Sequence, residues 1–548
     1  MAGRRARLGH TFNIGGDQAE ADPLLDEAFY NSTFYETMIA RDDPRCFIIG
    51  RTGSGKSAAL TRLAEEQAAK VIRIVPEDLS MPYITNLDVV QQLKDLDVDL
   101  SAFWKALWRH IFTVEVIKHR YNVDSADSKA SVLQNLRNVI SRDAGKKQAL
   151  AYLDEFDGRF WAETDERVKE ITTSLVTRIE DSGSVGVTAG PARVGFTGSD
   201  GTEYSESERR SIRVKYQRIV NETQLARLNK MMDVLHEDVL KSEQDFVYIV
   251  IDDLDKDWVD SSLSNELIMA LFKTVHDFKR VKNLKILVAL RTNIFVHMDF
   301  GSAAGGQEEK FRSLVLNMLW NRDQLRGLMD ERIRVAARRQ EADVVRVSEI
   351  LPNSNSRRGN AVDYILDRTL LRPRDFISFM RECLGASEGK GQVSWDAIKR
   401  AEVTYSENRL LALRDEWKLN NPGIDSLFEA FRRAPGRMDR AQITRILDEC
   451  ALTLADQAFV GAPWLKGLTA SIYAGRVDDP WAAQYGPLVR LFYDIGFLGA
   501  SMKGRRRASF SLDDELLINS NSSLDQVEFF YVAKAYHSVL EVETSDFN

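Results

Sequence analysis

The chain has 548 residues, of which 44% are hydrophobic and 28% are charged, a balance that is typical of packed globular proteins and excludes global disorder. Its 74 Lys and Arg residues stand against 82 Asp and Glu residues, and the net charge of −8 excludes a protein that coats nucleic acid by bulk charge. At about 100–200 residues per domain, the length predicts about three to five domains.

The first predicted elements follow the order strand, glycine-containing turn, helix. Apolar residues recur at helical spacing over 18–40 and predict a helix there, with Pro23 in its first turn and Asp22 as its cap. The apolar run 46–49 predicts a buried strand. The segment 57–69 favours a helix, and 71–75 predicts a second strand.

The middle of the chain is predominantly helical by its apolar spacing, from about residue 101 to 179. The Gly-, Ser- and Thr-rich stretch 182–203 predicts a mobile loop or a weak hairpin. A polar helix is expected over 205–240.

Two further apolar runs, 246–251 and 284–290, predict buried strands on either side of a helix over 265–280. Strands that are almost continuously apolar and alternate with helices are typical of a parallel sheet covered on both faces. After residue 310 we expect no further central strand. Helices are expected over 310–410 and 423–548, with one hairpin near 497–512.

The turn after the first strand reads GRTGSGKS and matches GxxxxGK(S/T) at every fixed position. Glycines let consecutive backbone N–H groups point into an anion-sized hollow, and the following helix adds partial positive charge. We expect Lys56 to reach the β- and γ-phosphates of ATP and the Ser57 hydroxyl to ligate Mg²⁺. The predicted ATP-binding residues are Gly50, Arg51, Thr52, Gly53, Ser54, Gly55, Lys56, Ser57 and Ala58.

Carboxylates follow the third predicted strand directly. Asp252 is the expected second Mg²⁺ ligand, because ligands of open α/β sheets sit at the carboxyl ends of strands. Asp253 is the expected general base for the attacking water, with a capping carboxylate as the alternative. Asp255 and Asp257 complete an acidic run that is equally compatible with a solvated turn.

Two arginines are candidates for sensing the γ-phosphate. Arg291 follows the fourth predicted strand, and a guanidinium there would stabilise charge developing on the phosphate. Further on, Pro373 and Asp375 favour the start of a helix, and we prefer Arg374 over Arg372 as the arginine that faces the nucleotide. The alternative for Arg374 is an ion pair with nearby carboxylates.

In chain order, GRTGSGKS, YIVIDDLDKDW, ILVALRTNIF, LWNRDQLRGLMDERI and LLRPRDFISFMREC resemble bacterial P-loop ATPases of the AAA+/STAND/KAP-like group, many of them encoded in antiphage defence loci. The resemblance covers about residues 15–400. It implies Mg²⁺-binding, hydrolytic and sensor roles for Asp252, Asp253 and Arg374, and it places the group's strand-end arginine on Arg291. Asn293 departs from the pattern, where the group has Asp.

The expected fold is an α/β P-loop NTPase core, a parallel sheet with helices on both faces, to which a large helical insertion, a helical lid and a C-terminal winged helix are added. The insertion is inferred because about 190 residues separate Lys56 from Asp252, more than two β-α units require. The predicted boundaries are 1–95 and 241–305 for the two parts of the core, 96–240 for the insertion, 306–415 for the lid and 416–548 for the winged helix.

The C-terminal segment holds the most basic short run, at the tip of the expected hairpin. Three helices followed by a hairpin make a winged helix, an order that resembles the C-terminal domains of origin-binding and STAND-type ATPases. The basic run would contact DNA phosphates or the minor groove, or it is a solvated turn in a domain that binds protein. Its cations are Lys503, Arg505, Arg506 and Arg507.

Two functions remain open at this point. The first is an ATP-hydrolysing switch whose nucleotide state controls homo-oligomer assembly and activation of a partner protein encoded nearby, in antiphage defence. The second is a DNA-binding ATPase of the origin- or mobile-element-loader kind. A metabolic kinase is disfavoured by the long insertion. Three separated cysteines without zinc-ligand spacing, and the lack of a signal or membrane-spanning run, predict a soluble cytoplasmic protein.

Overall fold

The computed structural model covers the 548-residue chain, and most of it can be described. The described residues are 6–76, 96–121, 126–141, 225–252, 261–296, 308–356, 358–418, 421–474, 479–505, 507–511 and 513–543, with isolated positions between them (93, 94, 150, 210, 213, 214, 216, 217, 254 and 298). The predicted loop at 182–203 lies outside these residues.

The chain forms two compact units. The sheet unit comprises Asn31–Arg51 and Lys56–Leu319, and the helical unit comprises Met1–Tyr30, Thr52–Gly55 and Trp320–Asn548. The tip of the glycine-containing turn thus belongs to the helical unit.

The sheet unit is built on five parallel strands in the order β2-β3-β4-β1-β5. The four predicted strands are confirmed, as β1 (Phe47–Gly50), β2 (Val71–Ile74), β3 (Val247–Ile251) and β4 (Leu284–Arg291). The expectation of helices alone over 310–410 is wrong at its start, because the short strand β5 (Val315–Asn317) pairs with β1. Since β5 lies at the edge of the sheet, no further central strand follows residue 310 among the described residues. With only three residues, β5 has too short an apolar run to be distinguished from a helical segment by periodicity.

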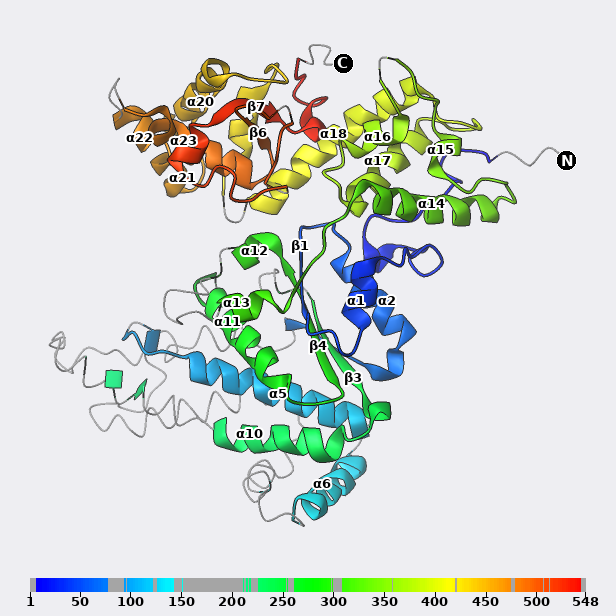
Figure 1. Ribbon diagram of the computed structural model, residues 1–548, viewed down its shortest axis with the longest axis vertical. Helices are drawn as coiled ribbons and strands as arrows, with labels where there is room; N and C mark the ends of the chain where they lie inside the picture. The colour runs from blue at the N-terminus through cyan, green and yellow to red at the C-terminus, as the bar shows by residue number, and fades with distance from the viewer. Residues whose placement is uncertain are drawn as a thin grey trace. The chain divides into compact units, whose positions relative to one another are not determined.

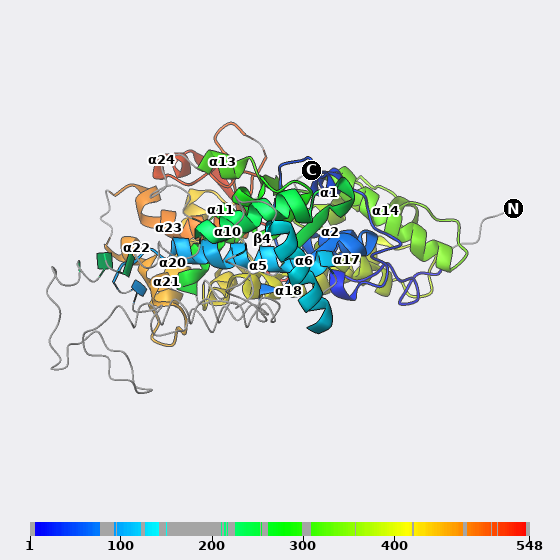
Figure 2. The same cartoon turned by 90° about the horizontal axis from the view of Figure 1, so that it is seen from below.

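Helices cover both faces of this sheet, as expected (Figure 1). On one side lie α1 (Thr33–Ile39) and α2 (Lys56–Glu66), and on the other lie α5 (Ser101–Tyr121) and α11 (Ser261–Phe278). Figures 1 and 2 both show α10 (Leu225–Val234) beside α5. The remaining described helices of the unit are α6 (Ala126–Ser141), α12 (Thr292–Val296), α13 (Glu308–Arg312), a π-helical turn (Leu235–Val239) and 3-10 turns at Ala68–Lys70 and Glu243–Asp245.

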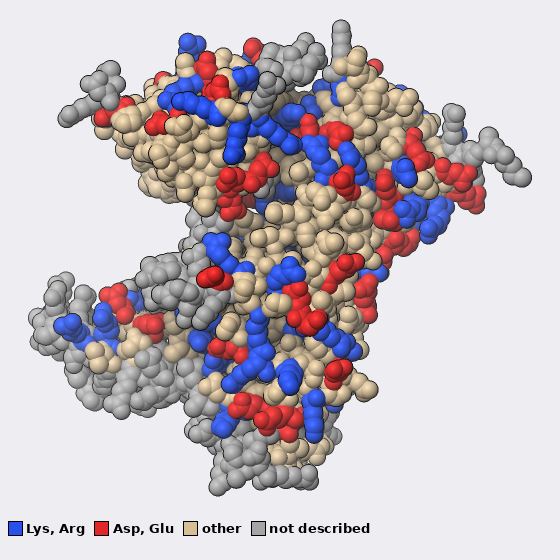
Figure 3. Space-filling view, viewed as in Figure 1, with Lys and Arg blue, Asp and Glu red and all other residues tan. Residues whose placement is uncertain are grey.

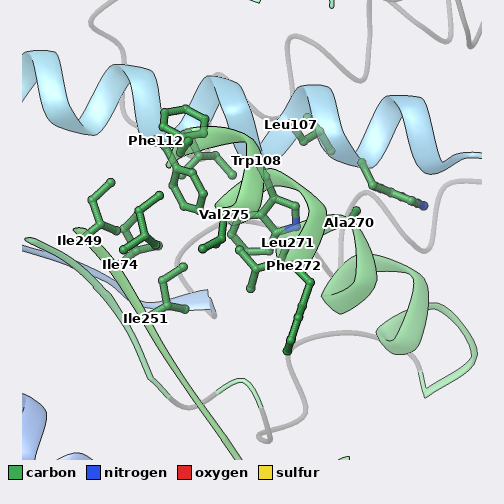
Figure 4. Packing of buried hydrophobic residues seen from close by; sticks show 14 of the residues in the cluster. Ile74, Leu107, Trp108, Phe112, Ile249, Ile251, Ala270, Leu271, Phe272 and Val275 are labelled. Carbon is green, nitrogen blue, oxygen red and sulfur yellow. The ribbon is translucent and has the colours of Figure 1, made fainter. Parts of the chain in front are cut away.

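An apolar core holds α5 and α11 to the sheet (Figure 4). Ile249 and Ile251 point from β3 toward Trp108 and Phe112 of α5 and toward α11. The indole N–H of Trp108 donates to the backbone carbonyl of Leu267, at 3.1 Å. The first helix of the predicted insertion therefore packs into the core of the sheet unit itself.

The helical unit begins with an N-terminal segment that has less helix than expected. Over residues 18–40 the chain forms only a 3-10 turn (Ala19–Ala21) and, in the sheet unit, α1. Asp22, expected as a helix cap, instead accepts hydrogen bonds from Gly16 and Leu24 and pairs with Arg332 at 2.6 Å.

The helices predicted over 310–410 are present in this unit. They are α14 (Arg322–Arg339), α15 (Val347–Ile350), α16 (Ala361–Leu366), α17 (Pro373–Gly385) and α18 (Trp395–Trp417). The C-terminal part adds α19 (Asp425–Phe428), a 3-10 turn (Glu429–Phe431), α20 (Arg440–Ala455), α21 (Pro463–Gly467), α22 (Ala470–Ala474), α23 (Trp481–Asp494), α24 (Asn521–Leu524) and the 3-10 turn η8 (Lys534–Tyr536).

A single helix, α18, takes part in two cores of the helical unit. Its first half contributes Ile398 and Tyr405 to the core formed with α14 and α17, and Leu413 belongs to the C-terminal core. At 1.5 Å per residue its 23 residues extend about 34 Å. A continuous helix of this length joins the two cores without a flexible linker.

The C-terminal strands pair differently from the predicted hairpin. β6 (Leu498–Met502) pairs antiparallel with β7 (Val527–Val532), and the segment after the basic turn meets β6 only through the bridge between Ala500 and Ser509. Among the described residues, the expected hairpin over 497–512 is therefore reduced to one antiparallel bridge, which lies on the opposite edge of β6 from β7.

Candidate functional site

The glycine-containing turn joins β1 to α2, as the strand–loop–helix motif requires. Gly53 has φ +78° and Gly55 has φ +96°, a conformation that L side chains rarely adopt. A Cβ at Gly53 would also lie 2.8 Å from the Cβ of Arg374. Both glycines are therefore required by the backbone path of the loop.

Lys56 opens α2 and is buried. Its ammonium donates to the carbonyls of Gly50, at 2.8 Å, and Arg51, at 3.1 Å. The charge is thus held over the first residues of the loop, beside the first turn of α2, whose backbone N–H groups have no partner inside the helix. Ser57 and Ala58 follow in that turn. This arrangement favours an anion.

Three consecutive carbonyls at the loop tip accept hydrogen bonds from other parts of the helical unit. Thr52 O accepts from Nη1 of Arg372 at 3.0 Å, Gly53 O from the backbone N–H of Arg374 at 3.3 Å, and Ser54 O from the indole of Trp320 at 2.7 Å. In a trans peptide the N–H points opposite to the C=O. Fixing these three carbonyls therefore orients the N–H groups of residues 53, 54 and 55 to the other side.

Two hydroxyl groups of the loop tip are buried and make no hydrogen bond within the described chain. They are Thr52 Oγ1 and Ser54 Oγ. Buried polar atoms nearly always have partners, so an orphaned pair requires an explanation. Phosphate oxygens would accept hydrogen bonds from both, and the loop residues therefore fit a nucleotide.

The sheet register brings Arg291 to the start of the loop. Arg291 is the register partner of Gly50 in the β1–β4 pairing. Asp252 comes directly after β3, whose last residue, Ile251, pairs with Val288 of β4. Since the strands are parallel, both residues lie at the carboxyl edge of the sheet, the edge from which the loop departs. Asp252 and Ser57 carry hard oxygen atoms, the kind of ligand that would suit Mg²⁺.

Asp253, Asp255 and Asp257 lie outside the described residues, and Arg506 of the basic run does too.

Among the described residues, no group of three or more His, Cys, Asp or Glu side chains could hold a metal ion. No described helix combines the length and the hydropathy needed to cross a membrane.

The two candidate arginines at the start of α17 differ in their surroundings. Arg374, the predicted sensor, is half-buried, and its Nε donates to the backbone carbonyl of Asp17 at 3.1 Å. Arg372 is buried, and its guanidinium contacts the loop carbonyl of Thr52 together with Asp375 at 2.8 Å. Both arginines therefore contact the loop, Arg372 through its guanidinium at Thr52 O and Arg374 through its backbone N–H at Gly53 O and its packing on Gly53.

The sequence did indicate the ion pair between Arg372 and Asp375. Pro373 occupies the first helical position of α17, which makes residue 372 the N-cap and Asp375 the third helical residue. An i,i+3 ion pair follows from that spacing. Trp320 carried no comparable signal, because its contact with Ser54 spans 266 positions of sequence.

Comparison with known proteins finds similarity to a domain family, to a curated protein and to solved structures. Residues 323–414 match the model of the FunZ-associated C-terminal helical domain. The chain is 23% identical over 444 residues to a protein of Escherichia coli (strain K12) named for transposon gamma-delta, of 80.3 kDa, covering 76% of this chain and 53% of that protein. The chain therefore spans about half the length of this relative.

Among the similar solved structures are a Walker-type ATPase of Pyrococcus abyssi and the Orc1 protein of Aeropyrum pernix, the latter in complex with DNA. The first has 10% identity and a TM-score of 0.36, covering 97% of this chain and 99% of that one. The second has 12% identity and a TM-score of 0.30, covering 93% and 96%. The parallel sheet of this chain and the loop between β1 and α2 are those of an α/β P-loop NTPase core.

Proposed function

We propose that the chain binds ATP at residues 50–58 and hydrolyses it, and that its nucleotide state controls assembly and activation of a partner protein in the cytoplasm of a bacterium, in antiphage defence. The observation that carries this proposal is the loop tip, where three carbonyls are fixed so that the intervening N–H groups face away from them. Such a cradle favours a phosphate group.

The proposed roles follow the chemistry of each side chain. Lys56 binds the β- and γ-phosphates, and Ser57 and Asp252 hold Mg²⁺, which neutralises charge on the phosphates when bound. Asp253 accepts a proton from water, whose oxygen attacks the γ-phosphorus as ADP leaves. Arg291, with Arg374 as the second candidate, stabilises the charge that develops on the γ-phosphate.

A switch is favoured over simple turnover because the loop tip belongs to the helical unit. Residues 52–54 hydrogen bond to Trp320 at the start of this unit's main segment and to Arg372 and Arg374 at the start of α17. Any movement of these loop peptides on phosphate binding or release must change those contacts. The helical unit therefore responds to the nucleotide directly.

Turnover and assembly can be tested on the full chain with two variants. Asp253→Ala is expected to bind Mg·ATP with nearly unchanged affinity and to lower kcat by about 10²–10⁴-fold, because proton transfer to a positioned base is lost. Sizing by light scattering is expected to show an ATP-dependent oligomer in the wild type and in Asp253→Ala, and none in Lys56→Ala. An oligomeric state that is independent of nucleotide and the same in Lys56→Ala would remove the switch.

The second candidate, a DNA-binding ATPase, is favoured by a cluster of cations around one end of β7. Arg437 stacks on the ring of Phe529 at 3.4 Å, Arg440 donates to the carbonyl of Asp525 at 3.0 Å, and the backbone of Lys503 donates to Gln526. Figure 3 shows Lys and Arg side chains gathered over α20 and β7, with Asp and Glu among them. Exposed Arg505 and Arg507 extend this cluster into the basic turn.

DNA binding would depend on salt, because each phosphate contact releases counterions. Replacing Lys503, Arg505, Arg506 and Arg507 by Ala is expected to weaken binding to a duplex and to reduce the slope of log K against log salt by up to about 4. Absence of binding at low salt by the wild type would eliminate this candidate and leave the switch.

A further inference from the structure

Four charged side chains form a buried ring behind the loop tip, in the helical unit. Arg372 pairs with Asp375 at 2.8 Å, Asp375 with Arg409 at 3.1 Å, Arg409 with Glu416 at 3.8 Å, and Glu416 with Arg372 at 3.4 Å. Every side chain of the ring is less than one-tenth exposed, from 1% for Asp375 to 9% for Glu416. Two cations and two anions make the ring electrically neutral.

Arg372 is the member of the ring that reaches the loop. Its Nε donates to Asp375, while its Nη1 is shared between Glu416 and the carbonyl of Thr52. Burial by itself would lower the pKa of Arg372, but the charges of Asp375 and Glu416 outweigh it and hold that pKa above the ordinary value. The guanidinium is therefore a permanent cation whose planar fork fixes one loop carbonyl.

The other half of the ring lies on α18. Arg409 and Glu416 belong to this helix, and one turn before Arg409 the hydroxyl of Ser406 donates to the carbonyl of Ala535 at 2.8 Å. The same hydroxyl accepts from the backbone N–H of Val539 at 3.1 Å. The ring thus connects the loop tip, through one helix, to residues 535–539 of the C-terminal core.

Stability alone is a weak reason for such a ring. Replacing a buried ion-pair cluster by apolar residues of similar volume is often neutral or stabilising, because desolvation offsets the Coulombic gain. What charged forks supply is fixed geometry, since each guanidinium holds several oxygens at once. The geometry fixed here is that of the Thr52 peptide.

We propose that Arg372 is a positioning residue of the nucleotide site, and that the ring couples the loop tip to the C-terminal core through α18. The inference rests on the proposed binding of ATP. In this proposal a bound nucleotide that tightens the Thr52 contact also tightens the contact of Ser406 with Ala535 and Val539. Because coupling is reciprocal, strengthening the Ser406 contact would in turn favour nucleotide binding. The C-terminal part of the chain then responds to the nucleotide state without binding a ligand itself.

The test uses Arg372→Lys in the full chain. Lysine keeps the positive charge of the ring but lacks the fork, so it cannot hold Asp375 and Thr52 together. Loss of one charge-assisted hydrogen bond is expected to raise the KM for ATP about 10-fold or more and to lower kcat less. Arg400→Gln is the matched control, because Arg400 is an exposed arginine of the same α18.

Amide hydrogen exchange at Val539, with and without Mg·ATP, gives a readout that a purely structural role would not move. ATP is expected to slow this exchange in the wild type and in Arg400→Gln but not in Arg372→Lys. Glu416→Gln, which removes a charge from the ring while keeping its shape, is expected to behave like Arg372→Lys and serves if the latter does not fold.

Three outcomes separate the claims. Loss of the ATP effect at Val539 in the ring variants, with the control unchanged, supports the coupling. Wild-type chain that binds ATP without any change at Val539, or a change that persists in both ring variants, overturns the coupling and leaves the proposed function intact. Wild-type chain that binds no ATP overturns the proposed function itself.

Discussion

The two units of this chain hold their buried regions together by different means. The core of the sheet unit is a cluster of aromatic and aliphatic side chains around Trp108 and Phe272. The helical unit has apolar cores too, but buried ion pairs join its segments: Arg332 with Asp22 at 2.6 Å, Arg368 with Glu402 at 2.7 Å, and the ring around Asp375. Apolar packing is non-directional, whereas charged forks fix orientation. The helical unit, which orients the loop carbonyls, is therefore the unit whose segments are joined by buried guanidinium–carboxylate pairs.

The largest effect on stability is expected in the apolar core. Trp108→Ala should lower the free energy of unfolding by about 3–5 kcal/mol, because it removes a fully buried ring and leaves a cavity. Denaturant unfolding measures the change. A loss below about 1 kcal/mol would show that this core does not hold the sheet unit together.

A similar loss in the free energy of unfolding is expected when one carboxylate of the charged ring is removed. Asp375→Ala leaves Arg372 and Arg409 buried without their shared carboxylate, at a cost of about 3–5 kcal/mol. Replacing all four ring residues by Met or Leu should, by contrast, change the stability little or raise it. If the fourfold variant were as unstable as Asp375→Ala, the ring would stabilise the fold rather than only fix orientation. The proposed difference between the two units would then be wrong.

The sheet unit has its own buried cation, and it should show in a pH profile. Lys285 donates to the carbonyls of Thr37 and Ala40, and burial lowers its pKa from the ordinary 10.5 to about 8. Between these values the unfolded chain binds a proton that the folded chain has released, so stability rises with pH. The resulting gain in the free energy of unfolding, up to about 3 kcal/mol, is complete above pH 10.5 and is lost as the pH falls to 8.

Unfolding measured from pH 7 to 10.5 on the wild type and on Lys285→Met gives this contribution by difference. The wild type should gain stability relative to the variant across that range. If the free energies of unfolding of the two proteins changed with pH in parallel, burial would not lower the pKa of Lys285. The sheet unit would then tolerate a buried charge as the helical unit does.

The smallest effect is expected for exposed ion pairs. Arg432 and Glu429 are partners at 2.9 Å, with side chains 40% and 62% exposed. Arg432→Ala should change the stability by less than about 1 kcal/mol. A larger loss would mean that charge pairing stabilises the helical unit in general, rather than only where it is buried.

The same contrast decides what could be predicted from the sequence. The strands β1 to β4 are almost continuously apolar runs, and the loop follows one of them at a fixed spacing, so both are local signals. Register then placed Arg291 opposite Gly50, a step that needs the sheet and not only the strands. The three-residue β5 was missed because so short a run carries no period.

The helical unit was less predictable because its defining contacts join distant residues. Asp22 was expected to cap a helix, yet its carboxylate is engaged by Arg332, more than 300 positions away. Thr52 O is held by Arg372, and Ser54 O by Trp320, across similar separations. No periodicity encodes such pairs, so the contact of Arg372 with the loop could be found only from the fold.

The central claim is that the loop between β1 and α2 binds ATP through Lys56. Isothermal titration of Mg·ATP into the full chain and into Lys56→Ala tests it most directly, with unfolding midpoints showing that both are folded. The account predicts saturable binding by the wild type and an affinity at least about 100-fold weaker in the variant, because the buried ammonium that opens α2 is gone. Equal affinities in the two proteins, or no binding by the folded wild type, would contradict it.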